Sequence, residues 1–184
     1  GTAFHCYYGD PARQSQLHDA YPAKDVYFTE CSGSQSQNPA TTFPDTLHWK
    51  TAELTVGAMR NWAKTVITWN LALDPSGGPH NGGCGTCFGV VTVDPATGKA
   101  TPTGDYYALG HASRFVRPGA VRIGSSVAGT IATSAFRNID GTIAIIAVND
   151  DWGTGSQRFT VRVGAHPFSY TLPAGAVATF TLGR

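Results

Sequence analysis

Glu30 is the residue of this sequence that is best placed for acid–base or nucleophilic chemistry. It directly follows a β-rich run, Val26–Thr29, and a long loop of Ser, Gly, Gln, Asn and Pro residues extends from Cys31 to Pro44. Catalytic groups of (β/α) barrels lie at this place, the carboxyl end of a strand. The same position also suits a loop-capping or solvent-exposed carboxylate, so placement alone leaves both interpretations open.

The first 115 residues alternate between strand-like and helix-like patterns. Apolar residues spaced by four and three predict a helix over Asp45–Lys64, with Asp45 as its N-cap. Strands and helices in this order are typical of the βα units of a parallel sheet or barrel. The strands expected around the helix are Thr2–Tyr7, Asp25–Thr29, Thr65–Asn70 and Phe88–Val93.

After residue 115 the helical period disappears, and short apolar runs recur about every ten residues. Turn residues separate these runs, and Asn138–Gly141, Gly153–Ser156 and Pro173–Gly175 are each expected to close a hairpin. The pattern predicts an antiparallel β-sandwich. Its expected strands are Val121–Gly124, Thr130–Phe136, Thr142–Asn149, Arg158–Val163, Phe168–Leu172 and Ala176–Leu182.

Three segments, in order along the chain, resemble glycoside hydrolase family 30. Tyr27–Gly33 is similar to the segment that carries the family's nucleophile. Thr68–Pro79 is similar to the last barrel strand and the loop after it. Tyr106–Gly119 resembles the helix that leads from the barrel into the β-domain. The resemblance covers essentially the whole chain.

This resemblance implies a fold that is α/β in its first part and all-β in its second. Residues 1–115 are expected to form the C-terminal strands and helices of a (β/α)8 TIM barrel, and residues 116–184 an antiparallel β-sandwich. His111 lies within the third matching segment, where a structural role is expected, tying the helix to the barrel.

The resemblance also gives Glu30 the role of nucleophile in a retaining β-glycosidase, where it attacks the anomeric carbon. The family includes lysosomal glucosylceramidase and microbial β-1,6-glucanases, so the expected partner is a β-linked glucoside or glucan. Tyr7 is expected to hydrogen-bond Glu30, with His5 on the same strand face. Trp69 would offer an apolar face to the sugar ring, and Asn70 would shape the same floor. Without the resemblance, Tyr7, Trp69 and His5 also fit core positions.

Retaining hydrolysis requires a second carboxyl group about 5 Å from the nucleophile. The sequence contains only two glutamates, and the other, Glu53, belongs to a helix that should lie outside the barrel. Asp10 and Asp74 lie in loops, but neither stands in the Asn-Glu context of the family's acid/base residue. We therefore expect this residue and the other barrel strands to come from the N-terminal part of the same enzyme. The isolated fragment is then expected to be inactive.

Cys84 and Cys87, with His80 just upstream, can be interpreted as part of a zinc site. Against this interpretation, Cys6 and Cys31 are lone residues in different strands, whereas structural zinc usually has two close ligand pairs. A disulfide that staples the glycine-rich loop fits better. Cys6 and Cys31 are expected to point away from the candidate site, where they pack as thiols or form a bridge. No metal and no cofactor is expected.

Composition restricts the partners further. The chain has 184 residues and is 41% hydrophobic, with 13 basic and 12 acidic residues and no basic cluster, which argues against nucleic acid as a partner. No apolar run approaches the roughly 20 residues that a bilayer span requires. Four cysteines, a single methionine and few charges are typical of a secreted or extracellular protein.

The main alternative function is a non-catalytic carbohydrate-binding β-sandwich module. Many such modules are antiparallel sandwiches rich in Thr, Tyr and Trp, and Trp152 would be the natural binding platform here. Residues 1–115 have no place in that interpretation. A purely structural or interaction domain has no large apolar surface motif in its favour.

Overall fold

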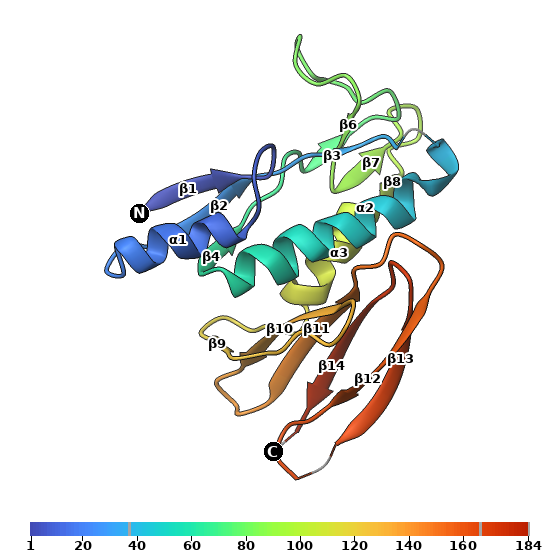
Figure 1. Cartoon of the computed structure of the whole chain (residues 1–184). Helices are drawn as coiled ribbons and strands as arrows, with labels where there is room; N and C mark the ends of the chain where they lie inside the picture. Colours follow the sequence, from blue (N-terminus) through green and yellow to red (C-terminus); the bar gives the residue numbers. More distant parts are fainter. Residues whose placement is uncertain (37, 166, 184) are drawn as a thin grey trace.

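Three parallel strands with helices on one side form the first part of the fold (Figure 1). The computed structural model describes residues 1–36, 38–165 and 167–183. The strand order is β1–β2–β4, in which Phe4 pairs with Phe28 and Phe28 with Val66. The strands are β1 (Thr2–His5), β2 (Val26–Glu30) and β4 (Ala63–Val66), and the helices are α1 (Ala12–Ala20), α2 (Thr42–Lys50), its π-helical continuation η2 (Thr51–Ala58) and α3 (Gly104–Ser113).

Helix α2 begins earlier than its sequence pattern predicts. The N-cap prediction for Asp45 is wrong, because the helix begins at Thr42, after a short 3-10 turn at Pro39–Thr41. Asp45 lies in the first turn, where its carboxylate accepts a hydrogen bond from Thr41 Oγ1 at 2.7 Å. Pro44 fits in this turn because first-turn N–H groups have no acceptor within the helix.

Two small sheets lie in the loops at the carboxyl end of the parallel strands (Figure 1). The strand predicted over Phe88–Val93 is divided in two, because at Gly89 the chain passes so close to the backbone of Ala72 and Leu73 that a Cβ would lie 2.8 Å from it. The first sheet pairs β3 (Gly33–Ser34) with β6 (Cys87–Phe88), and the second contains β5 (Ala72–Leu73), β7 (Val91–Val93) and β8 (Ala100–Pro102).

The second part of the chain forms two antiparallel sheets, in the orders β14–β11–β10–β9 and β12–β13. Only the turn Asn138–Gly141 of the three predicted hairpin turns joins neighbouring strands of one sheet. Gly153–Ser156 and Pro173–Gly175 instead lie between strands of different sheets, so those two hairpin predictions are wrong. The strands are β9 (Val121–Ile123), β10 (Ile131–Arg137), β11 (Ile143–Asn149), β12 (Ser156–Val161), β13 (Phe168–Pro173) and β14 (Val177–Leu182).

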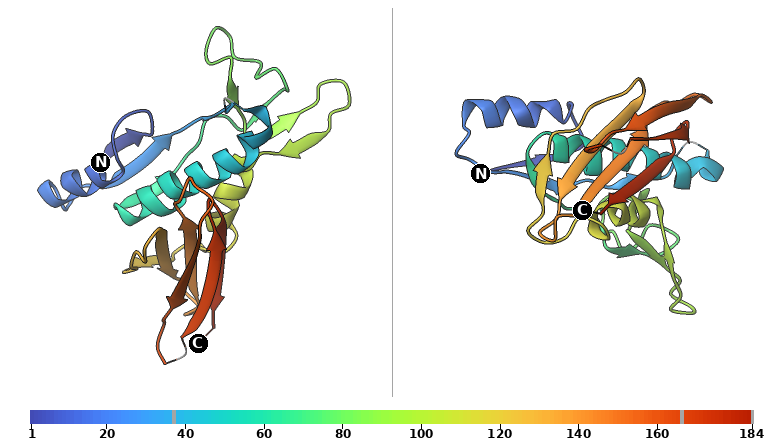
Figure 2. Two further views of the ribbon diagram at one scale, coloured as in Figure 1. Left: turned by 45° about the vertical axis from the view of Figure 1, so that its right-hand side comes forward. Right: turned by 90° about the horizontal axis from the view of Figure 1, so that it is seen from below.

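Strand β11 is buried on both faces, which explains its nearly uninterrupted apolar sequence. Its residues Ile145 and Ala147 belong to the core between the two sheets. Ile146 and Val148 point the other way and pack with Val56 of η2. The long helix α2–η2 therefore lies between the parallel sheet and the sandwich, and Figure 2 shows it crossing over the strands of the sandwich.

Candidate active site

Glu30 is the last residue of β2, at the carboxyl end of the parallel sheet. Phe28 and Cys31 both lie in the core between the sheet and the helix, together with Leu54 of η2. The pairing with β1 shifts by one residue here, since Phe4 pairs with Phe28 but His5 with Glu30. Such a bulge re-aims side chains, so that Glu30 lies on the face of the sheet away from the helix.

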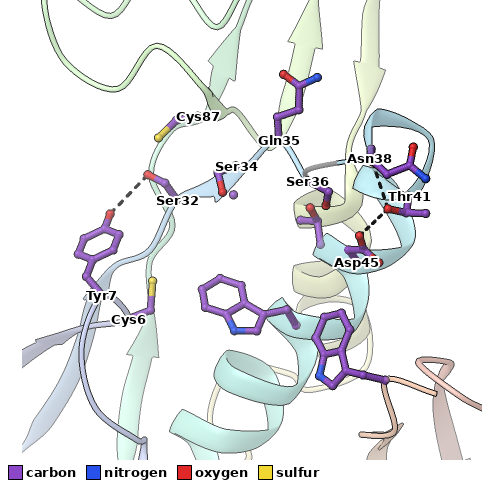
Figure 3. A pocket seen from close by; sticks show the side chains of 14 residues that line it. Cys6, Tyr7, Ser32, Ser34, Gln35, Ser36, Asn38, Thr41, Asp45 and Cys87 are labelled. Carbon is purple, nitrogen blue, oxygen red and sulfur yellow. Dashed lines mark hydrogen bonds between the residues drawn. The ribbon is translucent and has the colours of Figure 1, made fainter.

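The Tyr7 hydroxyl group donates a hydrogen bond to Glu30 Oε1 at 2.9 Å, as the sequence predicts. It also lies 3.4 Å from Ser32 Oγ (Figure 3), and its ring meets His5 edge-on with a centroid distance of 5.8 Å. The pKa of Tyr7 is raised above its usual value, mainly because the side chain is partly buried. The hydrogen bond to Ser32 lowers this pKa, whereas the hydrogen bond and the charge of Glu30 raise it. Tyr7 is therefore a protonated hydrogen-bond donor at neutral pH.

Trp69 and Asn70 follow β4 and continue its alignment with the segment that follows Glu30. Trp69 forms a single parallel bridge with Ser32, and its backbone N–H donates to the Cys31 carbonyl at 3.0 Å. The Trp69 side chain is 53% exposed. Asn70 holds the following loop, because its side-chain oxygen accepts from the Ala72 N–H at 3.2 Å. The structure thus brings Trp69 beside the segment that follows Glu30, and sugar contact by Trp69, Asn70 and His5 stays a prediction.

Two disulfides pair the four cysteines. Cys6–Cys31 joins the segments that follow β1 and β2, and so ties together the two chain segments that carry Tyr7 and Glu30. Cys84–Cys87 staples the glycine-rich loop, as predicted, and this bond consumes both thiolates of the possible zinc site. Across the described ranges, no group of three or more His, Cys, Asp or Glu side chains could hold a metal ion.

A buried ion pair lies behind the segment that follows Glu30, and no sequence pattern pointed to it. Lys50 of α2 donates to the Cys31 carbonyl oxygen at 2.8 Å and lies 3.1 Å from Asp105 Oδ1 of α3. Both side chains are at most 2% exposed. Burial lowers the pKa of Lys50 and raises that of Asp105, while their mutual attraction opposes both shifts. In sequence, Lys50 looks like any exposed helical lysine.

Glu53, the second glutamate, lies on the helical side of the sheet. It belongs to η2 and lines a small cavity with Phe4, Phe28 and Gln14. Burial is the main cause that raises the pKa of Glu53, and the charges of nearby aspartates add to it. Neither Glu30 nor Tyr7 lines this cavity, so we do not assign Glu53 as the partner carboxyl group of Glu30.

Two sequence profiles of one family match the chain. The profile of the glycosyl hydrolase family 30 TIM-barrel domain matches residues 1–116, and that of the family's β-sandwich domain matches residues 119–180. An endo-1,6-β-D-glucanase of Neurospora crassa is 34% identical over 158 residues, which are 83% of this chain and 30% of the relative. A Trichoderma harzianum endo-1,6-β-D-glucanase is 30% identical over 192 residues, 98% of this chain and 36% of the relative.

Solved structures agree with these sequence matches. The endo-β1,6-glucanase BT3312 has a TM-score of 0.85 and 35% identity, over 100% of this chain and 41% of that chain. SrfJ from Salmonella typhimurium has a TM-score of 0.88 and 27% identity, over 99% of this chain and 40% of that chain. The chain thus spans 30–41% of the length of these relatives.

In the described part of the chain, no helix is both long enough and apolar enough to cross a bilayer. The predicted fold class is confirmed: strands and helices of a (β/α)8 barrel precede an antiparallel β-sandwich. Because the barrel profile alone matches residues 1–116 of 184, this chain belongs to glycosyl hydrolase family 30.

Proposed function

We propose that this chain supplies the nucleophile of a retaining β-glycosidase, and that the nucleophile is Glu30. The observation that carries this proposal is the hydrogen bond from Tyr7 to Glu30 Oε1, 2.9 Å long, at the carboxyl end of a barrel strand. A nucleophilic carboxylate must be held in one orientation, and the tyrosine donor provides this.

The partner acid/base carboxyl group comes, in this proposal, from the N-terminal part of the same enzyme. Glu53 lies on the helical side of the sheet, and the three parallel strands make up only part of an eight-stranded barrel. The relatives are about three times longer than the region matched here. These 184 residues alone are therefore expected to be inactive.

β-1,6-Linked glucan is the substrate that we propose. The curated relatives from Neurospora crassa and Trichoderma harzianum, and one solved structure at 35% identity, are named endo-β-1,6-glucanases. A glucosylceramide-like β-glucoside is the second candidate, since a Caenorhabditis elegans glucosylceramidase-like protein is 29% identical over 89% of the chain. We also propose a secreted enzyme, because both disulfides require an oxidising compartment.

The two glutamates of the chain provide a test with its own control. In the intact enzyme, Glu30→Gln should lower kcat on β-1,6-glucan by at least about a thousandfold, because no covalent intermediate can form. Glu53→Gln should leave kcat within about twofold, because this side chain lies on the other side of the sheet.

A mechanism-based 2-deoxy-2-fluoroglucoside identifies the nucleophile directly. Peptide mapping by mass spectrometry should find the label on Glu30 of the intact enzyme. In a separate experiment with unlabelled enzyme, NMR of the first products should show that the anomeric configuration is retained. Labelling of another residue, or full activity of Glu30→Gln, would overturn the assignment. Turnover of an aryl β-glucoside by the isolated chain would overturn the claim that the acid/base group lies elsewhere.

A further inference from the structure

A groove extends from the candidate active site toward the junction of the barrel part and the sandwich. Its volume is about 680 Å³, within the range of ligand sites in proteins. Figure 3 shows Tyr7 and Ser32 on one side of it, and Asn38, Thr41 and Asp45 on the other. The groove is lined by Cys6, Tyr7, Ser32, Gly33, Ser34, Gln35, Ser36, Asn38, Thr41, Asp45, Thr46, Trp49, Cys87 and Trp152.

The groove is continuous with the site of the proposed chemistry. Tyr7 lines it and, with the same hydroxyl group, contacts Glu30 and Ser32. A polymer with one unit beside Glu30 can therefore extend past Tyr7 into this groove. Segments 6–7 and 32–36, which form one wall of it, both follow strands of the parallel sheet.

Trp152, on the loop between β11 and β12, is an exposed aromatic ring with a rigid support. Its side chain is 60% exposed, yet its ring lies 4.1 Å from that of His48, at an angle of 30°. His48 is 3% exposed and is held by Asp150, with 3.0 Å between Nε2 and Oδ1. One side of Trp152 is therefore fixed against buried protein, and the rest of the ring is available to the groove.

The remaining lining suits a neutral, hydroxyl-rich ligand. It consists mainly of hydroxyl and amide side chains, and none of its described residues is Lys or Arg. Its one carboxylate, Asp45, already accepts a hydrogen bond from Thr41. Trp49 adds a second indole, half-buried against the core that contains the Cys6–Cys31 disulfide. Carbohydrate sites combine aromatic faces with a few oriented polar groups in this way.

We propose that this groove binds further glucosyl units of the β-1,6-glucan chain that is cleaved at Glu30, with Trp152 as the stacking platform. This inference rests on the proposed function, because it takes its ligand from it. It adds a site contributed by the sandwich domain, so that the barrel and the sandwich bind one polymer together. The groove favours long chains over short ones, because only long chains reach from Glu30 to Trp152.

The first experiment separates binding from catalysis. In the intact enzyme carrying Glu30→Gln, calorimetry with a β-1,6-linked glucohexaose should give a Kd about tenfold higher after Trp152→Ala, and a nearly unchanged Kd after Trp152→Phe. Trp62→Ala is the matched control. Trp62 is also exposed, at 43%, and also stacks on a histidine, His18, with ring centroids 3.7 Å apart, but it lies outside the groove.

The second experiment uses active enzyme. Trp152→Ala should raise KM for β-1,6-glucan about tenfold and leave kcat/KM for an aryl β-glucoside within about twofold, since the small substrate does not reach the groove. In the intact enzyme carrying Glu30→Gln, which should not cleave the ligand, glucohexaose should protect Trp152, but not Trp62, from oxidation by N-bromosuccinimide, as read by peptide mass mapping. This readout requires no substitution of Trp152.

Three results would overturn the inference: an unchanged hexaose Kd in Trp152→Ala, an equal loss in Trp62→Ala, or no protection of Trp152. Failure of the proposed function is distinguishable from these results. If Glu30→Gln stays active or the label falls elsewhere, the function itself is wrong. If Glu30 is labelled and Trp152→Ala binds hexaose normally, only the groove assignment fails.

Discussion

At the scale of single residues, the site depends on which side of a strand each side chain points to. Cys6 directly follows β1 and Cys31 directly follows β2, and both cysteines pack in the core between the sheet and the helix. The Cys6–Cys31 bond then fixes the two strand ends from the core side. Next to this bond, Tyr7 and Glu30 are held at hydrogen-bonding distance.

Removal of the Tyr7 hydroxyl group tests this arrangement. Tyr7→Phe should lower kcat/KM of the intact enzyme about tenfold to a hundredfold, because a hydrogen bond to a charged group contributes about 1.5–3 kcal/mol. Tyr8→Phe is the control, since Tyr8 is 98% exposed. Steady-state kinetics on an aryl β-glucoside measures both. Equal activity of Tyr7→Phe and the unmutated enzyme would show that this bond does not serve catalysis.

The Tyr7–Glu30 contact was expected from the resemblance to glycoside hydrolase family 30, because the segments that carry both residues match segments of that family's active site. The Cys6–Cys31 bridge could be predicted only as one of two possibilities, because alternation gives direction and not distance. Lys50 could not be predicted at all. Its neighbours in the sequence show a helix, but its partners, Asp105 and the Cys31 carbonyl, come from distant parts of the chain.

At the scale of elements, the Lys50–Asp105 pair joins helices α2 and α3 behind the loop that follows Glu30. Lys50 binds the Cys31 carbonyl, and the Asp105 carboxylate lies so close to Gly33 that any Cβ there would clash with it. The pair is buried, so each charge depends on the other to offset its loss of hydration. We infer that it holds the Cys31–Gly33 backbone in place.

Removing either partner of this ion pair should lower the free energy of unfolding. Lys50→Met should lower the free energy of unfolding of the intact enzyme by about 3 kcal/mol or more, because Asp105 remains buried without its partner. The double variant Lys50→Met with Asp105→Leu should be more stable than either single variant. Thermal or urea unfolding measures all three. Strictly additive losses would contradict the coupling.

A surface ion pair of the same chain provides the comparison. Lys64 and Asp25 also form an ion pair, but their side chains are 62% and 41% exposed. Lys64→Met should therefore cost much less stability than Lys50→Met, because water already screens the exposed pair.

Other elements show what the sequence pattern leaves out. Helix α1 has no apolar period, and its one fully buried residue is Gln14, so periodicity could not reveal it. Helix α2 was predicted from apolar spacing, but its start depends on Asn38 and Pro39, which initiate a 3-10 turn upstream. In the sandwich the strands were predictable, whereas the assignment of turns to hairpins was not, because it depends on which sheet receives the next strand.

At the scale of the whole molecule, polar contacts supplement the apolar packing between helix α2–η2 and the sandwich. Ser134 Oγ donates to the Thr55 carbonyl at 2.7 Å, and Arg60 Nη1 donates to the Thr133 carbonyl at 2.6 Å. These pairs are more than 70 residues apart in sequence. No local pattern specifies them, which is why the sequence predicts two domains but not how they pack.

His111 belongs to this long-range network. The sequence predicted a structural role for it, as a tie between the helix and the barrel. The predicted partner is wrong, because His111 Nδ1 lies 2.8 Å from Thr179 Oγ1 of β14, which belongs to the sandwich. The segment resembles a helix that leads out of the barrel, and in the folded chain the same helix also packs on the sandwich. Burial lowers the pKa of His111 below 6.5.

This burial makes stability dependent on pH in a defined direction. Below pH 6.5 the unfolded chain binds a proton on His111 more readily than the folded chain, so the free energy of unfolding falls as the pH drops from 6.5 through the lower pKa of the folded state. His111→Gln should remove this contribution and flatten the pH dependence of urea unfolding of the intact enzyme. Thr179→Val, which removes the hydrogen bond but keeps the titrating ring, should lower stability at every pH and preserve the slope. If His111→Gln keeps the slope of the unmutated enzyme, acid sensitivity arises elsewhere, and His111 contributes only packing to the contact between α3 and the sandwich.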